Sequence, residues 1–167
     1  MYKRQGFTKV DGKIYLLDSN GVLQTTTDEP GVTIREDGSC KIKRGWNKTS
    51  DGHYIYRKKN GGIVRNRWLT RKGNRYYCDD NGYRVTGMQT IHDKKYYFTK
   101  DGVMQTGWVT YKKNRYYFKL NGEMKTGWLK YKGNKYYLRS NGKMVKNKTI
   151  KIKGKRYTFD KKGRLVK

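Results

Sequence analysis

Short segments of alternating apolar and polar residues recur along the chain about every twenty residues. In one of them, residues 108–111 (Trp-Val-Thr-Tyr) and 115–118 (Arg-Tyr-Tyr-Phe) flank a polar link at 112–114. β-Branched and aromatic residues on both sides of a short polar link are typical of a β-hairpin. Because an isolated hairpin is at best marginally stable, each one must bury its aromatic face against its neighbours. The pattern therefore predicts an all-β fold, a solenoid of stacked hairpin repeats.

Three sequence marks define the repeat: Gly-Trp, an aromatic pair eight and nine residues after that tryptophan, and Asn-Gly or Asp-Gly. Nine Asn-Gly or Asp-Gly pairs occur, and they suit tight turns because both residue types tolerate positive φ. The marks indicate about eight repeats of about twenty residues in a single domain over 1–167, with one degenerate unit and one loop-like stretch at 25–31. The units are 6–25, 26–44 (degenerate), 45–66, 67–86, 87–106, 107–126, 127–146 and 147–167.

Composition narrows the class of protein. The chain has no alanine and 20 glycines, which argues against a helical bundle. No apolar run approaches the roughly 18 residues that a membrane span needs. A hydrophobic content of 34% with a net charge of +28 is also typical of disordered chains, but the aromatic residues recur on a fixed period. We therefore expect a folded repeat protein with an unusually basic surface.

The same marks, followed in several units by Met and Thr-Gly, form a specific combination. It resembles the cell-wall-binding repeats of Gram-positive surface proteins and phage lysins, the superfamily of choline-binding and glucan-binding modules. Residues 68–145 match best, and the first unit looks more like the glucan-binding variety. The resemblance implies a β-solenoid at the cell wall that tethers proteins to wall polymers or extracellular glucans. It also implies a catalytic or adhesive partner domain attached to the module.

One position departs from the choline-binding pattern. In choline-binding members a second aromatic residue, usually Trp, stands seven residues after the Gly-Trp tryptophan and helps to form a cage for the quaternary ammonium. Here that position holds His53, Arg75, Lys95, Arg115 and Lys135. Ring faces attract a cation, whereas a Lys or Arg side chain in the cage wall repels it. The gap between Trp108 and Trp128 is therefore expected to take an anion or a neutral sugar, and choline binding is disfavoured.

The candidate ligand-binding residues combine these cations with neighbouring aromatic rings, because Arg and Lys donate to phosphate or hydroxyl oxygens while rings stack on apolar faces. They are Trp46, Trp68, Arg75, Tyr76, Lys95, Tyr96, Trp108, Arg115, Tyr116, Trp128, Lys135 and Tyr136. Further basic residues are placed in the hairpin links, among them 57–59 and 94–95, where they would align into stripes that capture a polyanion. In this family's setting the obvious polyanions are teichoic and lipoteichoic acids.

The remaining marks are expected to build the core. One tyrosine of each pair should face inward, and Met104, Met124 and Met144 should fill gaps. Cys78 takes the place that phenylalanine holds in other units, which predicts a buried free thiol. Two cysteines are too few for a disulfide framework.

We expect no enzymatic activity, no cofactor and no metal site. His53 and His92 have no metal-ligating residue at a suitable spacing, and the Asp residues of the repeats fall in turns. Nucleophile, general base and phosphate-binding loop are all missing from the sequence pattern. The leading hypothesis is thus a non-catalytic wall-binding or glycan-binding module for an anionic wall polymer or a glucan.

The alternative is a protein that binds nucleic acid or another polyanion through basic stripes and aromatic stacking. The high charge favours it, and so does the beginning of the chain, where no apolar segment of a secretory signal follows residues 1–6. An excised module of a secreted protein, a separately translated binding subunit or a phage protein released by lysis would account for the same beginning.

Overall fold

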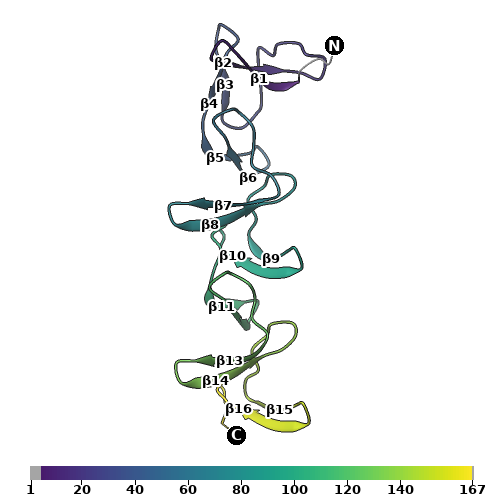
Figure 1. The fold of residues 1–167 in the computed structure, drawn as a ribbon, viewed down its shortest axis with the longest axis vertical. Coiled ribbons are helices and arrows are strands. Elements are labelled where there is room, and N and C mark those ends of the chain that lie inside the picture. The colour runs from purple at the N-terminus through teal and green to yellow at the C-terminus, as the bar shows by residue number, and fades with distance from the viewer. Residues whose placement is uncertain (1–4, 167) are drawn as a thin grey trace. The chain divides into compact units, whose positions relative to one another are not determined.

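The computed structural model describes residues 5–166 and contains sixteen strands in that range, paired as eight antiparallel hairpins without a helix. Each hairpin is a separate two-stranded sheet (Figure 1). The predicted all-β fold of about eight hairpin repeats is confirmed. The chain divides into two compact units, residues 1–85 and 86–167, and each contains four hairpins. A single domain over 1–167 stays a prediction. Among the described residues there is no helix able to cross a membrane.

The C-terminal unit repeats one hairpin design four times. Its strands are β9 (Gly87–Ile91), β10 (Lys94–Phe98), β11 (Gly107–Tyr111), β12 (Asn114–Phe118), β13 (Gly127–Tyr131), β14 (Asn134–Leu138), β15 (Lys148–Ile152) and β16 (Lys155–Phe159). In β11–β12 the register runs from Gly107 opposite Phe118 to Tyr111 opposite Asn114. The two-residue loop between them, Lys112 and Lys113, has φ values of 45° and 63°. Positive φ at both loop residues matches the right-handed twist of the strands, which favours a tight hairpin.

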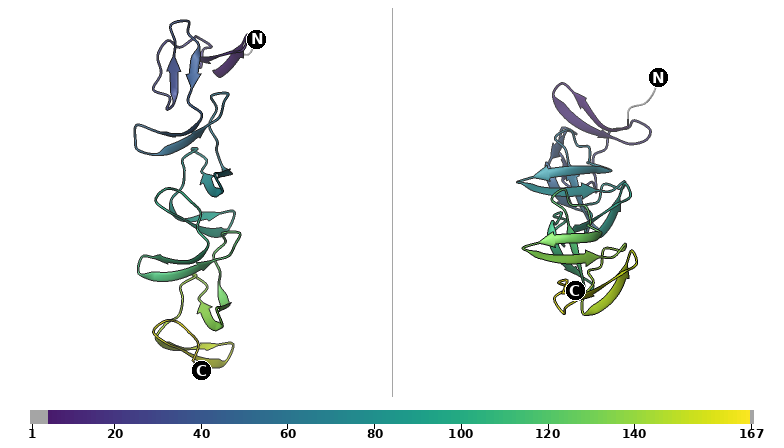
Figure 2. Two further views of the ribbon diagram at one scale, coloured as in Figure 1. Left: turned by 90° about the vertical axis from the view of Figure 1, so that its left-hand side faces the viewer. Right: turned by 60° about the horizontal axis from the view of Figure 1, so that its bottom comes forward.

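Backbone hydrogen bonds stack successive hairpins of this unit. Past each hairpin the chain turns and a single residue returns to the preceding hairpin. The amide of Met124 donates to the carbonyl of Lys95 at 2.7 Å, and that of Met144 donates to Arg115 at 2.8 Å. The hairpins are therefore linked one to the next as a solenoid, which Figure 2 shows for the green to yellow part of the chain.

The core is a column of side chains that directly follow the aromatic pairs. Phe98, Phe118, Leu138 and Phe159 are at most 2% exposed. Cys78 occupies the same position in the N-terminal unit and is fully buried, so the predicted buried thiol is confirmed. Burial raises the pKa of Cys78 to about 11.

The half-buried methionines fill the space over the glycine of the next Asn-Gly or Lys-Gly turn. A Cβ atom built on Gly122 would lie 2.3 Å from the sulfur of Met104. Gly122 also has a φ of +88°, so both its conformation and its surroundings require glycine.

The N-terminal unit is less regular. Its strands are β1 (Gly6–Val10), β2 (Lys13–Leu17), β3 (Val32–Ile34), β4 (Cys40–Ile42), β5 (Gly45–Lys48), β6 (Tyr54–Arg57), β7 (Arg67–Arg71) and β8 (Asn74–Cys78). The degenerate unit forms the short hairpin β3–β4, and it follows the loop that the sequence predicted near residues 25–31. Thus even the repeat without Gly-Trp and Tyr-Tyr keeps a hairpin.

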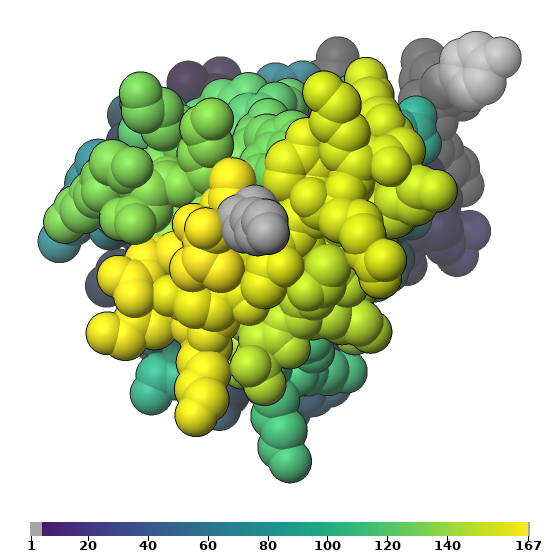
Figure 3. Space-filling model, turned by 90° about the horizontal axis from the view of Figure 1, so that it is seen from below, coloured from purple at the N-terminus to yellow at the C-terminus, as the bar shows by residue number. Residues whose placement is uncertain are grey.

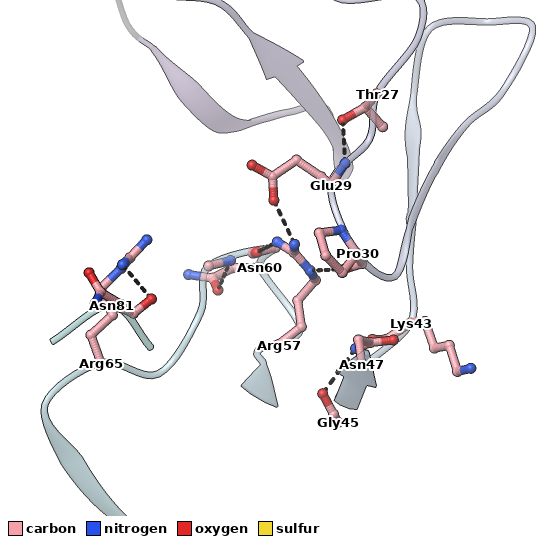
Figure 4. Close-up of polar contacts among 12 residues, drawn as sticks. Thr27, Glu29, Pro30, Lys43, Gly45, Asn47, Arg57, Asn60, Arg65 and Asn81 are labelled. Atoms are coloured by element: carbon pink, nitrogen blue, oxygen red, sulfur yellow. Dashed lines mark hydrogen bonds and ion pairs between the residues drawn. The ribbon is translucent and has the colours of Figure 1, made fainter. Parts of the chain in front are cut away.

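A buried arginine holds that loop against β6 (Figure 4). The guanidinium of Arg57 donates to the carbonyl oxygens of Pro30 at 2.6 Å and Gly61 at 2.5 Å, and to the carboxylate of Glu29 at 2.7 Å. It also lies 5.4 Å from the ring centroid of Phe7. The prediction that placed Arg57 in a solvated hairpin link is therefore wrong, because its side chain is 1% exposed.

Lys94 and Lys95 also differ from the prediction, since both lie within β10 rather than in a link. The hairpin loop falls two residues earlier, at His92 and Asp93, where φ is 46° and 61°. A basic residue in this hairpin therefore projects from the strand face itself.

Candidate ligand-binding site

The residue seven positions after each Gly-Trp tryptophan shares a hairpin face with that tryptophan. In β11–β12, Trp108 is opposite Tyr117 and Thr110 is opposite Arg115, and residues two apart on a strand point to the same side. The backbone carbonyl of Arg115 is held by the amide of Met144, while its side chain is exposed. The guanidinium carbon lies 4.6 Å from the centroid of the Trp108 ring.

Trp108 is surrounded by rings from its own hairpin and from the next. Its ring centroid lies 5.2 Å from that of Tyr117, 6.1 Å from Tyr131 and 5.1 Å from Tyr136. The structure thus brings together three predicted site residues: Trp108, Arg115 and Tyr136. Tyr116, also predicted, is 7% exposed and packs in the core.

A basic cleft of about 570 Å³ opens beside this ring cluster, and we call it the basic cleft. Arg115, Tyr131, Tyr136 and Met144 contribute to its wall. Seven Lys and Arg side chains line it, and the described lining residues include no Asp or Glu. They are Lys113, Arg115, Lys132, Lys146, Lys161, Lys162 and Arg164. Figure 3 looks onto the end of the chain that supplies the last three, where the yellow side chains extend outward.

The charge of the whole chain is concentrated in the same unit. Residues 86–167 contain 23 of the 41 Lys and Arg residues but four of the 13 Asp and Glu residues. In the basic cleft, Arg164 pairs with Asp160 at 2.7 Å. The other six cations of the cleft form no ion pair with a described residue. A cleft with so little internal compensation attracts anions.

A second cleft of about 440 Å³, the Trp128 cleft, lies one hairpin further along. It is lined by Trp128, Leu129, Lys130, Lys135, Tyr157 and Leu165. The ring centroids of Trp128 and Tyr157 are 4.9 Å apart in a T-shaped arrangement. Trp128 is 37% exposed. Lys135, the predicted partner of Trp128, lines the cleft beside it.

The N-terminal unit repeats the arrangement with different partners. Trp46 lies 5.2 Å from Tyr76 between ring centroids, and both border a cleft of about 520 Å³. Arg75 places its guanidinium carbon 4.6 Å from the ring of Trp68. Arg84 stacks over Trp46 at 5.3 Å, and its Nε is buried without a hydrogen-bond partner in the described part of the chain.

The other two predicted residues, Lys95 and Tyr96, lie in β10. Lys95 is exposed and its carbonyl accepts the Met124 amide, whereas Tyr96 is half-buried. Neither lines one of the clefts described above. His53, which stands at the departing position of its own repeat, stacks on Tyr83 at 4.3 Å with nearly parallel rings.

Several lining residues escaped the sequence prediction. Tyr157 belongs to the last repeat, which has no tryptophan, although it follows Tyr136 by 21 residues and could have been found by that period. Tyr131 stands three residues after Trp128 and has a counterpart in Tyr111, which was also a usable signal. Lys146 and Arg164 carry no repeat mark, so only the fold places them in the cleft. In residues 5–166 no group of His, Cys, Asp and Glu side chains is arranged to hold a metal ion.

Two family models of wall-binding repeats match the chain. The choline-binding repeat matches residues 85–126 and 125–167, and the cell wall binding repeat matches residues 5–23 and 66–84. A comparison with curated proteins finds no match.

Solved structures of choline-binding proteins share this fold. Choline binding protein F from Streptococcus pneumoniae is 29% identical, with a TM-score of 0.72 over 98% of this chain and 58% of that chain. The same protein in the presence of a peptidoglycan analogue is 26% identical, with a TM-score of 0.71 over 98% and 52%. The choline-binding domain of CbpL from the same species is 25% identical, with a TM-score of 0.68 over 98% and 87%. The chain thus spans little more than half the length of choline binding protein F.

Proposed function

We propose that this chain, which belongs to the superfamily of cell-wall-binding repeats of the choline-binding type, is a non-catalytic module that binds an anionic wall polymer. Teichoic and lipoteichoic acids are the polymers that fit best, since both carry repeating phosphates. The observation that carries the proposal is the basic cleft, with seven cations and no carboxylate among its described lining residues.

The chemistry of the cleft suits a phosphate-bearing chain. Arg115 offers a planar set of N–H donors that matches phosphate oxygens, and the neighbouring lysines add compact positive charge. Tyr131 and Tyr136 provide rings for the apolar parts of the polymer backbone. Because hairpins with basic residues recur, one polymer can occupy several clefts at once, and avidity then exceeds the affinity of any single site.

The first test is retention on purified Gram-positive cell walls at physiological salt, before and after chemical removal of the phosphate polymers. We expect retention on intact walls and its loss on stripped walls. Equal retention on both would contradict an anionic ligand. Failure to bind either preparation would overturn wall binding and make a single-stranded nucleic acid the next ligand to test.

A pair of charge-matched variants locates the binding surface. Lys161→Gln with Lys162→Gln removes two cations from the basic cleft. Lys41→Gln with Lys48→Gln removes two exposed cations that line none of the clefts. If the cleft binds the polymer, the first pair should weaken retention about tenfold and the second by much less, since each lost charge-assisted contact contributes on the order of 1 kcal/mol. Equal effects would indicate non-specific attraction by net charge.

A glucan or another neutral glycan is the second candidate ligand, and the Trp128 cleft favours it. Trp128 and Tyr157 offer exposed ring surface, and Lys130 and Lys135 can donate to hydroxyl groups. Trp128→Ala should abolish retention on phosphate-stripped walls or on immobilised dextran, if such retention exists, and should change salt-sensitive retention little. Neutral stacking responds weakly to salt, whereas polyanion binding falls steeply with it.

Such a module acts at the wall by holding another activity there. We include in the proposal an extracellular, wall-bound location and a catalytic or adhesive partner domain that the module tethers. Fusion of the chain to a fluorescent protein tests this, because the fusion should label Gram-positive cells and lose the label when soluble lipoteichoic acid competes.

A further inference from the structure

Three of the four tryptophans carry an arginine over the ring. The guanidinium carbon lies 5.3 Å from the ring centroid for Arg84 over Trp46, 4.6 Å for Arg75 over Trp68 and 4.6 Å for Arg115 over Trp108. Trp128 has no Lys or Arg over its ring in the described part of the chain. The difference coincides with a sequence difference, because the position occupied by Arg75 and Arg115 is Lys135 in the Trp128 repeat.

The arrangement of these arginines follows from the hairpin register. Arg115 faces the same side of its hairpin as Trp108, on the neighbouring strand. Its backbone is held by the hydrogen bond to Met144, so the side chain begins at a fixed point next to the ring. A planar guanidinium then stacks on the indole face, which the ammonium of lysine does less readily.

A stacked guanidinium has two consequences for the ligand. It occupies the electron-rich face that a cationic ligand would need, and its charge repels that ligand. It also keeps its N–H groups directed to the sides. Neither Arg75 nor Arg115 makes a side-chain hydrogen bond or ion pair with a described residue, so these donors are available to an oxyanion.

We propose that Arg75 and Arg115 determine the charge selectivity of their sites: each fills the face of its tryptophan as a built-in cation, closes it to cationic ligands and offers its free N–H edge to a phosphodiester. The Trp128 cleft lacks this cap and keeps its ring face open. The phosphodiester part rests on the proposed function, whereas the closure to cations is independent of it.

The test uses the full chain and the four indole N–H signals in a proton–nitrogen correlation spectrum, titrated separately with choline and with glycerol phosphate. In the wild type, choline should shift the Trp128 signal and leave the Trp108 signal in place, and glycerol phosphate should shift Trp108. In Arg115→Ala, choline should now shift the Trp108 signal, with an affinity raised at least about tenfold, and the response to glycerol phosphate should be lost.

Lys113→Ala is the matched control, since it removes a cation from the same cleft without uncovering the ring. It should weaken the glycerol phosphate response and leave Trp108 unresponsive to choline. If Lys113→Ala opens Trp108 to choline as Arg115→Ala does, bulk charge and not the cap determines selectivity. If wild-type Trp108 responds to choline as strongly as Arg115→Ala does, the inference is overturned. Because the readout uses small ligands, loss of wall retention alone would count against the proposed function and not against the caps.

Discussion

The sulfur of Met124 packs against the α-carbon of Gly142, the glycine of the next Asn-Gly turn. A Cβ atom built on Gly142 would lie 2.3 Å from that sulfur, and Gly142 has a φ of +80°. The same contact recurs between Met104 and Gly122. The glycine of the turn is therefore required twice, once by its own backbone and once by the methionine of the preceding repeat.

Gly142→Ala should lower the free energy of unfolding by about 3 kcal/mol, because strain at positive φ and displacement of Met124 add together. Gly133→Ala is the control, since its φ is +75° but no atom lies within 4 Å of the added Cβ. The control should lose about 1 kcal/mol from strain alone. Urea unfolding followed by tryptophan fluorescence measures both, and equal losses would contradict the packing role of Met124.

Lys113→Gly should stabilise the protein. Lys113 adopts a φ of 63° in the loop of β11–β12, and the corresponding loop position is glycine in the neighbouring hairpin, at Gly133. Relief of that strain should raise the free energy of unfolding by about 0.5–1 kcal/mol. Lys113→Gln removes the same charge and keeps the strain, so a matching gain in that variant would show that charge repulsion, and not the backbone, is responsible.

Arg57→Ala should be among the most destabilising substitutions in the N-terminal unit. It leaves the carbonyls of Pro30 and Gly61 without their donor and opens space beneath Phe7. We expect a loss of about 3–5 kcal/mol. Glu29→Gln should lose less than about 1 kcal/mol, because that carboxylate is half exposed. Thermal unfolding of the two variants separates the buried hydrogen bonds from the ion pair, and similar losses would contradict this division.

Cys78 should couple stability to alkaline pH. Its folded pKa is raised by burial to about 11, above the ordinary value of 9.0. A group with a raised pKa contributes stability below its unfolded pKa, and this contribution is lost as the pH rises through the folded value. The midpoint of thermal unfolding should therefore fall more steeply between pH 9 and 11 in the wild type than in Cys78→Val. Parallel curves would contradict a buried thiol in the folded state.

The same burial should protect both thiols from alkylation. Cys40 is 6% exposed and Cys78 is fully buried. Iodoacetamide at pH 8 should label neither residue in the native protein and both in urea, as counted by intact mass. Native labelling of Cys78 would show that the core column opens readily.

The period, the hairpins and the buried column could be read from the sequence, because each depends on residues close together in the chain. The aromatic pairs fix the strand register, and Cys78 reveals its burial by standing where phenylalanine stands elsewhere. Arg57 could not be assigned in this way. Its partners Glu29 and Pro30 lie 28 and 27 residues away in the irregular unit, where the repeat gives no spacing to follow.

The candidate site was predictable in part for the same reason. Arg115 and Lys135 occupy equivalent positions in the sequence and both were expected to repel a cation, yet one stacks on its tryptophan and the other borders an open cleft. That difference depends on side-chain conformation rather than on spacing. Lys146 and Arg164 reach the basic cleft from segments without repeat marks, and the solenoid alone brings them there.

The contact between the methionine of one repeat and the glycine of the next makes each twenty-residue block complementary to itself at both ends. Removal of residues 107–126 would leave Met104 facing Gly142 in place of Gly122, with the same pair of surfaces. Duplication of a block would create another such pair without altering the old ones. Unequal recombination within a gene of this kind can therefore lengthen or shorten the protein in whole units while every junction stays closed, and the number of binding clefts becomes a heritable quantity that changes without a single amino-acid substitution.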